Sequence, residues 1–283
     1  MWQNSYDGKN SLYLIPTPIG NLEDITIRSL NVLKKIKIIF SEDTRVTSLL
    51  LNKYGINCKL YSLHEHNEDK VKEKVLEFLR NGQDVALVTD RGTPIISDPG
   101  YKTVAYVSSY GYNVISLPGA TAFVPALTAS GIEPQPFLFY GFLNSKDSKK
   151  RKELEKIRNI EYTIIFYEAP HRILGTLNLM KEVLGNRKIS ISREISKKYE
   201  SIYRGDLETL LSDFPVLKGE FVITLEGNKN FDDSNFNLNV TKLVDDYVNQ
   251  GHTISESIKY ISKEYGLSKN EVYLEYHKNK GMK

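Results

Sequence analysis

The stretch Val85-Ala-Leu-Val-Thr-Asp-Arg-Gly-Thr-Pro-Ile-Ile-Ser-Asp-Pro-Gly100 opens with an apolar run and continues into a loop of glycine, proline and acidic residues. The run Val85–Thr89 predicts a buried strand. In an open α/β sheet, ligands bind at the carboxyl ends of the strands, which is where this loop lies. The stretch therefore predicts an α/β fold and the sheet edge at which a site is expected.

Four more apolar, β-branched runs have the same arrangement, each followed by a loop of unusual composition. They are Leu12–Pro16, Lys37–Phe40, Lys59–Leu63 and Val114–Leu117. Stretches with helical apolar spacing lie between most of them, and this alternation predicts a parallel, doubly wound sheet. The opposite strand ends, at 81–84 and 108–111, have the composition of ordinary turns. A small-molecule site is therefore expected at the carboxyl edge.

Strand-like runs return in the second half and predict a second α/β domain with a mixed sheet. They are Phe137–Tyr140, Tyr162–Tyr167, Lys188–Arg193, Ser201–Arg204 and Glu220–Leu225. The expected organisation is a flexible N-terminus (1–11), two α/β domains (12–117 and 118–227) with a ligand cleft between them, a polar linker (228–239) and a small helical module (240–283). That module is either a helix-turn-helix or a packing appendage.

Composition excludes several classes of protein. The chain has 283 residues, 40% of them hydrophobic, and a formal net charge of +3. No apolar run approaches the roughly 18 residues of a membrane span, and the first ten residues are too polar for a secretory signal. The single Cys58 excludes an internal disulfide, so a cytoplasmic protein without a membrane partner is expected.

Three kinds of site are also disfavoured. Neither G-x-G-x-x-G nor G-x-x-x-x-G-K-[ST] occurs, which disfavours a dinucleotide-binding domain and a P-loop NTPase. His64 and His66 share a strand face, but no third ligand has a clear spacing, so no metal site is expected.

Positive charge is concentrated in the second half. Residues 144–160 contain seven basic and three acidic residues, and residues 187–204 contain six basic and two acidic ones, so the remainder of the chain is net negative. A basic footprint of this kind is typical of nucleic-acid binding, although a solvated helix face is the alternative for 144–160. Tyr140, Phe142 and Tyr199 are candidates for stacking on bases.

Several long motifs occur in a fixed order from about Leu12 to Gly227. They are Thr17-Pro-Ile-Gly-Asn-Leu-Glu-Asp24, Glu42-Asp-Thr-Arg45, His64-Glu-His-Asn-Glu68, Gly92-Thr-Pro94, Ser97-Asp-Pro-Gly-Tyr101, Tyr167-Glu-Ala-Pro-His-Arg172 and Gly219-Glu-Phe-Val222. With these motifs the chain resembles the type I ribosomal RNA small-subunit methyltransferases, which have a tetrapyrrole-methylase-like fold. The resemblance implies a homodimer that transfers a methyl group from S-adenosylmethionine to a cytidine 2′-hydroxyl of 16S ribosomal RNA in the small subunit.

The resemblance also implies a set of cofactor-binding residues. They are Pro18, Gly92, Thr93, Ile96, Thr121, Ala122 and Tyr167. The chain departs from the family pattern at Arg91, where a small residue is usual, and this places a bulky positive charge near the expected sulfonium. Because of Arg91, a non-catalytic nucleic-acid-binding protein is one alternative function. A methylase that acts on a tetrapyrrole-like small molecule is the other, because the same fold allows it.

A ribose hydroxyl becomes a good nucleophile only when a nearby group removes its proton. The candidates at the strand ends are Glu42, Asp43, His64, Glu65, Asp90 and Asp98, joined from the second domain by Glu168, His171 and Lys197. Asp43, Glu65 and Glu168 are the preferred catalytic residues. Expected RNA contacts are Arg45, Lys149, Lys150, Arg151, Lys152, Arg172, Arg193 and Lys197. Arg45 and Arg172 either clamp phosphate or orient Asp43 and Glu168.

Overall fold

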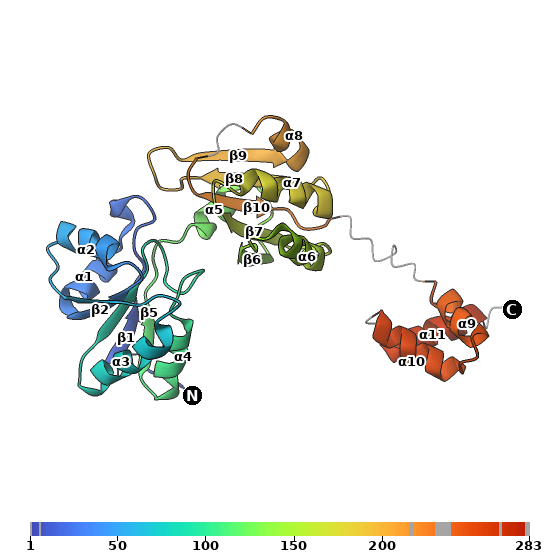
Figure 1. Ribbon diagram of the computed structural model, residues 1–283, viewed down its shortest axis with the longest axis horizontal. Coiled ribbons are helices and arrows are strands. Elements are labelled where there is room, and N and C mark those ends of the chain that lie inside the picture. Colours follow the sequence, from blue (N-terminus) through green and yellow to red (C-terminus); the bar gives the residue numbers. More distant parts are fainter. Residues whose placement is uncertain (1, 6, 215–217, 230–238, 266–267, 281–283) are drawn as a thin grey trace. The chain divides into compact units, whose positions relative to one another are not determined.

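The computed structural model describes residues 2–5, 7–214, 218–229, 239–265 and 268–280, with the backbone alone at 279–280. Its contacts divide the chain into two compact units, Met1–Asn228 and Lys229–Lys283. Among these described residues, the first unit contains two five-stranded sheets and the second contains three helices (Figure 1).

The first sheet is wholly parallel, with the strand order β3-β2-β4-β1-β5. Its strands are β1 (Ser11–Leu14), β2 (Ile38–Ser41), β3 (Lys59–Ser62), β4 (Val85–Val88) and β5 (Asn113–Ser116). All five predicted runs are therefore strands, and the prediction of a parallel sheet is confirmed. Because β4 lies between β2 and β1, the chain reverses its direction across the sheet, as in doubly wound folds.

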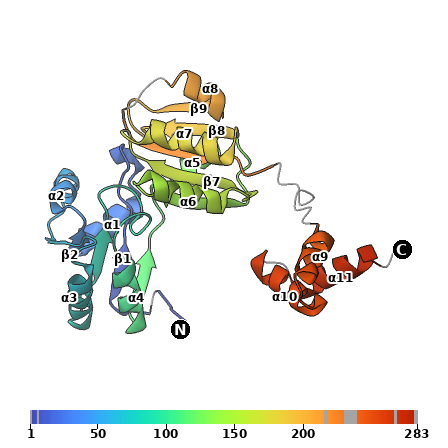
Figure 2. The same ribbon diagram turned by 45° about the vertical axis from the view of Figure 1, so that its right-hand side comes forward.

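Helices cover both faces of this sheet (Figure 2). The helical elements are η1 (Leu22–Asp24), α1 (Ile27–Lys35), α2 (Thr44–Lys53), α3 (Glu68–Arg80) and α4 (Tyr101–Ser109). Alternate strand residues point to opposite faces, so Phe40 and Leu87 pack with α3 and α4, whereas Ile39 and Val88 pack with α1 and α2. Burial on both faces explains why the inner strands β2 and β4 are nearly continuous apolar runs.

The second sheet is mixed, as the sequence predicted, with the order β6-β7-β10-β8-β9. Its strands are β6 (Phe137–Phe142), β7 (Thr163–Glu168), β8 (Lys188–Arg193), β9 (Ser201–Asp206) and β10 (Phe221–Leu225). The pair β6–β7 is parallel and the other pairs are antiparallel. The accompanying helices are α5 (Phe123–Ala129), α6 (Asp147–Ile157), α7 (Ile173–Leu184) and α8 (Leu207–Ser212).

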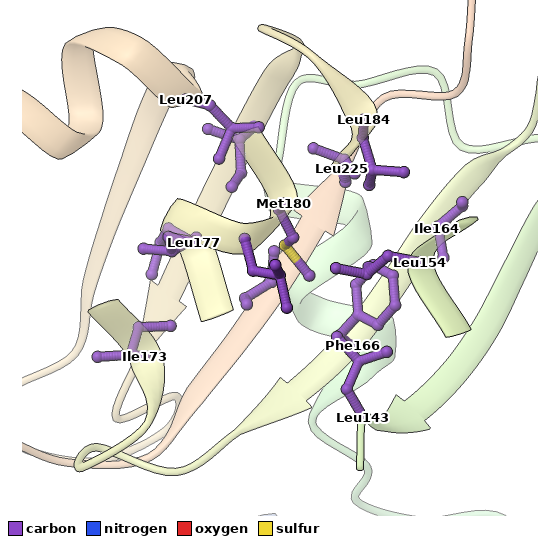
Figure 3. Packing of buried hydrophobic residues seen from close by; sticks show 14 of the residues in the cluster. Leu143, Leu154, Ile164, Phe166, Ile173, Leu177, Met180, Leu184, Leu207 and Leu225 are labelled. Carbon is purple, nitrogen blue, oxygen red and sulfur yellow. The ribbon is translucent and has the colours of Figure 1, made fainter. Parts of the chain in front are cut away.

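One large core joins the second sheet to helices α6, α7 and α8. Met180 of α7 lies among Leu177, Leu225 and Phe166, all of them fully buried (Figure 3). Helix α5 packs on the other face, where Ala126 and Leu127 contact residues of β7 and β10. The second sheet is thus held between helices, which fixes the position of β7 and its carboxyl end.

The second unit consists of α9 (Val240–Asn249), α10 (Ile254–Glu264) and α11 (Lys269–Lys280) around a small apolar core. Thr253 and Glu256 form a capping box at the start of α10. Ser268 and Glu271 exchange the same two hydrogen bonds at the start of α11. Residues 230–238 of the expected linker lie outside the described residues.

Near the N-terminus, the Gln3 side chain exchanges hydrogen bonds with the backbone of Val114 in β5. In the part of the chain that the structure describes, no helix is both long and apolar enough to cross a membrane.

Candidate cofactor cavity and active site

A cavity of about 330 Å³ lies where the carboxyl ends of β1, β4 and β5 meet the second sheet. The parallel-sheet half contributes the loops after these three strands, and the mixed-sheet half contributes the ends of β7 and β10. The lining residues are Ile19, Arg91, Gly92, Thr93, Ile96, Ser97, Asp98, Thr121, Ala122, Phe142, Tyr167, Glu168, Ala169, Pro170, Ile195, Glu220, Phe221 and Val222. Its size is within the range of small-molecule and cofactor sites.

The loop after β4 is held tightly beside the loops after β1 and β5. Gly92 and Thr17 exchange two backbone hydrogen bonds of 3.0 and 2.9 Å, and Thr93 donates its hydroxyl to the carbonyl of Ala120 at 3.0 Å. Gly92 has a φ of +87°, and an added Cβ would come within 3.3 Å of the Ile19 side chain. Glycine is therefore required here both by conformation and by the close approach of Ile19.

Asp98 is a partly buried carboxyl group that lines the cavity. Burial raises its pKa to about 6, the nearby Glu42 and Asp90 carboxylates raise it too, and a hydrogen bond from Thr89 opposes them. The single hydroxyl proton of Thr89 is shared between Asp98 and Glu42, whose Oε2 lies 3.2 Å from the hydroxyl oxygen. The result is an acidic cluster at the ends of β2 and β4 with one member that takes up a proton near neutral pH, as suits a general base.

Glu168, at the end of β7, is a buried carboxylate whose charge is matched by Arg172. Its side chain is 1% exposed, and Arg172 Nε lies 3.0 Å from its Oε1. Thr176 donates to Oε2 at 2.6 Å and the backbone N–H of Ala169 donates to Oε1 at 2.8 Å. Arg172 also donates to the carbonyl of Leu143 at 2.6 Å. This network fixes the wall of the cavity formed by Ala169 and Pro170.

Arg91 forms a salt bridge with Glu220 across the mouth of the cavity. Glu220 also accepts from Lys197 at 2.9 Å, and Lys197 in turn contacts Glu194 at 2.8 Å. Two cations thus face two carboxylates, so the positive charge of Arg91 is locally balanced. Ser196 adds a further link by donating to Asp24.

The predicted cofactor-binding residues converge with one exception. Six of the seven line the cavity, namely Gly92, Thr93, Ile96, Thr121, Ala122 and Tyr167. Pro18 is buried and lines a neighbouring cavity instead. Burial raises the pKa of the Tyr167 phenol, while hydrogen bonds from Thr121 and the backbone of Phe123 oppose that shift. Tyr167 therefore connects β7 to the loop that leads into α5.

The three preferred catalytic residues do not come together. Glu168 lines the cavity, whereas Asp43 and Glu65 do not. Asp43 caps α2, and its hydrogen bonds with the Arg45 side chain and backbone lower its pKa to about 2. Such a weak base is poorly matched to proton abstraction at neutral pH. Glu65 is exposed in the turn before α3. Asp98, one of the wider set of candidates, has the better position.

The predicted RNA contacts fall into three groups. Lys149 and Lys152 are exposed on α6, and Arg151 pairs with Glu182 at its edge. Lys150 is 2% exposed and faces Asp147, because it shares the inward stripe of α6 with Leu154 and Ile157. Arg45, Arg172, Arg193 and Lys197 all bind protein groups, namely Asp43, Glu168, the carbonyl of Lys218 and Glu194.

Other lining residues had no sequence signal that singled them out. Ile195 and Phe221 line the cavity from the loop after β8 and from β10. Their composition is that of ordinary core residues. Within the described residues, no group of three or more His, Cys, Asp or Glu side chains is placed to hold a metal ion.

Comparison with known proteins identifies the class. Residues 11–211 match the family model of the tetrapyrrole (corrin/porphyrin) methylases. Among solved structures, the methyltransferase CobJ has a TM-score of 0.59 at 16% identity, covering 78% of this chain and 95% of that one. A Thermus thermophilus uroporphyrin-III C-methyltransferase complexed with S-adenosylhomocysteine has a TM-score of 0.54 at 18% identity, covering 76% and 97%. The fold is that of the tetrapyrrole methylases.

Curated relatives narrow the class to one family. The chain is 44% identical to the ribosomal RNA small subunit methyltransferase I of Bacillus subtilis, over 97% of this chain and 98% of the relative. It is 43% identical to the protein of that name from Escherichia coli O157:H7, over 80% and 81%. The chain therefore belongs to the ribosomal RNA small subunit methyltransferase I family.

Proposed function

We propose that this protein transfers a methyl group from S-adenosylmethionine to the 2′-hydroxyl of a cytidine in the 16S RNA of the small ribosomal subunit. The observation that carries the proposal is the near full-length similarity to methyltransferases of that RNA, together with a cavity formed where both halves of a methylase fold meet. The cytidine and the 2′-oxygen come from the resemblance of the motifs.

The residues of the cavity fit S-adenosylmethionine. Gly92 allows the backbone to approach a ligand closely, and Ile19, Ile96 and Val222 provide apolar surface. Asp98 supplies negative charge beside the cavity, while Glu220 balances Arg91. When bound, the cofactor supplies a methyl carbon activated by a positively charged sulfur. The cavity would orient that carbon and exclude water from it.

We propose Asp98 as the group that receives the ribose proton. In the transfer a bond forms between the 2′-oxygen and the methyl carbon, the sulfur–carbon bond breaks, and the sulfur keeps the electron pair. The hydroxyl proton passes to the Asp98 carboxylate and then to solvent. A pKa of about 6 leaves this carboxylate mostly ionised at pH 7 yet basic enough to assist.

We propose that RNA phosphates contact the exposed Lys149 and Lys152 of α6, where the sequence has its densest positive charge. Lys150 has no part in this surface because it is buried. A homodimer and a cytoplasmic location are also proposed, since the resemblance implies the first and the composition favours the second. Light scattering coupled to size exclusion tests the homodimer.

Methyl transfer from labelled S-adenosylmethionine to two acceptors tests the function. The acceptors are small ribosomal subunits from cells lacking the modification and uroporphyrinogen III. Label in the subunit RNA alone is expected. Label in the tetrapyrrole alone would establish the small-molecule methylase instead, and cofactor binding without transfer to either acceptor would also contradict the proposal.

A further inference from the structure

A second cavity, of about 570 Å³, adjoins the first one on the side of α2. The loops after β1 and β4 separate the two, because Ile19 and Gly92 line the first cavity whereas Pro18 and Asp90 line the second. Arg91 lines both. A ligand in the second cavity would therefore lie directly beside one in the first.

The second cavity has an apolar wall and a polar wall. Helix α2 presents Val46, Leu49 and Leu50, and the side chain of Leu49 is 74% exposed. Thr89 and Asp90 form the polar side at the end of β4. An apolar surface facing hydrogen-bonding groups suits a planar heterocycle with polar edges.

Thr47 gives an independent sign of a ligand. It lines the second cavity, is 3% exposed, and its hydroxyl has no hydrogen-bond partner among the described residues. A buried hydroxyl without a partner is destabilising, because it has given up its hydrogen bonds to water and gained none in return. A ligand that offers a donor or an acceptor at this position would recover that loss.

The second cavity continues outward into a groove that shares Gly20, Leu22, Lys53 and Lys197 with it. Lys198 also lines this outer groove, and its ammonium lies 5.7 Å from the centre of the exposed Tyr199 ring. Among the described residues that line this groove, Glu23 is the acidic one. Neither Lys53 nor Lys198 forms an ion pair with a described carboxylate, so both are available to a polyanion.

We propose that the second cavity holds the base of one unstacked nucleotide of an RNA strand, the nucleotide to be methylated, and that its ribose lies at the edge near Arg91 that the two cavities share. The strand's phosphates follow Lys53 and Lys198 in the outer groove. The proposal rests on the proposed function. Enzymes that modify one nucleotide take it out of its stack into a pocket. Thr89 lines the second cavity and forms a hydrogen bond with Asp98, which lines the first, so a ribose at the shared edge would lie close to the proposed base.

Charge and shape variants with matched controls test the proposal. Leu49→Glu is compared with Ile27→Glu, because Ile27 is 78% exposed on α1 and lines neither cavity. Lys53→Glu is compared with Lys35→Glu in the last turn of α1. Thr47→Val removes the unpartnered hydroxyl and keeps the shape. Each variant is assayed for methyl transfer to unmodified small subunits and, by calorimetry, for affinity toward S-adenosylhomocysteine.

Leu49→Glu is expected to lower kcat/KM for the subunits by about 10- to 100-fold, the effect of losing one base contact. Lys53→Glu is expected to weaken subunit binding and reduce its salt dependence. Both variants should bind S-adenosylhomocysteine as the wild type does. The proposal is overturned if Leu49→Glu and Ile27→Glu have equal activity, or if Leu49→Glu loses cofactor affinity in parallel with activity. A wild-type enzyme inactive on subunits would instead overturn the proposed function.

Discussion

Arg91, at the carboxyl end of β4, forms a salt bridge with Glu220, which directly precedes β10. The contact joins the parallel-sheet half to the mixed-sheet half at the mouth of the cavity. It also balances the positive charge of Arg91, the residue at which the chain departs from the family pattern.

The Arg91–Glu220 pair predicts different effects for its two members. Arg91→Ala should change the affinity for S-adenosylmethionine by no more than about fivefold, since exposed ion pairs contribute about 0–1 kcal/mol. Glu220→Gln leaves Arg91 and Lys197 without their shared carboxylate. It should weaken binding of the cationic S-adenosylmethionine more than binding of the neutral S-adenosylhomocysteine. Calorimetry with both ligands measures this, and a large gain in affinity for Arg91→Ala would show that the guanidinium obstructs the site.

Asp98 predicts the pH dependence of the reaction. Because its pKa is about 6, kcat/KM of the wild type should rise with pH and level off above about 6. Asp98→Asn should abolish this rise and lower the rate by about 10²- to 10⁴-fold. The pKa of Asp98 is higher in the folded protein than its ordinary value of 3.8. Ionisation of Asp98 therefore lowers the free energy of unfolding as the pH rises from about 4 to about 6. Asp98→Asn should therefore melt at a higher temperature than the wild type above pH 6 and at the same temperature below 3.8. A normal rate for the Asp98→Asn variant would exclude Asp98 as the base.

Gly92→Ala should weaken cofactor binding more than backbone strain alone would. Alanine at Gly92 and at Gly82 meets a similar left-handed backbone, with φ of +87° and +76°, which costs about 1–2 kcal/mol. The added methyl group meets Ile19 at Gly92 but open space at Gly82. Both variants should be less stable, and only Gly92→Ala should bind S-adenosylhomocysteine at least about tenfold more weakly, which corresponds to about 1.4 kcal/mol. Equal affinities in the two variants would place the cofactor elsewhere.

Arg172→Ala should lower the free energy of unfolding more than the other substitutions considered. Removing it leaves the buried Glu168 carboxylate without its cation, at an expected cost of about 3–5 kcal/mol. Arg151→Ala is the matched control, because it breaks an exposed pair with Glu182 worth about 0–1 kcal/mol. Urea unfolding compares the two variants. Similar small losses would mean that Glu168 accepts burial without Arg172, and Glu168→Gln in the Arg172→Ala background should restore part of the stability.

The apolar runs in the sequence predicted the ten strands of the two sheets, because burial of a strand determines which residues it contains. Strand order is not local, and it determines which loops meet. The cavity takes its loops from β1, β4 and β5, which are neighbours, whereas β2 and β3 lie beyond β4. Asp43 and Glu65 follow β2 and β3, so their position at strand ends made them candidates while the strand order places them away from the cavity.

The burial of Lys150 was indicated by its helical spacing, but the local density of basic residues favoured the wrong interpretation. Its spacing from Leu154 and Ile157 is that of the inward stripe of α6, yet the count of basic residues favoured a phosphate contact. Leu49 and Thr47 carry no local signal, because a second cavity exists only once α2 is placed beside the loops after β1 and β4.

The most direct test of the proposed ribose methylation is the nucleoside composition of small-subunit RNA after reaction. Purified protein and isotopically labelled S-adenosylmethionine are incubated with subunits that lack the modification, and the RNA is digested and separated by mass spectrometry. We expect labelled 2′-O-methylcytidine. Label on a base carbon or nitrogen, on a different nucleoside, or on none despite measured cofactor binding would contradict it.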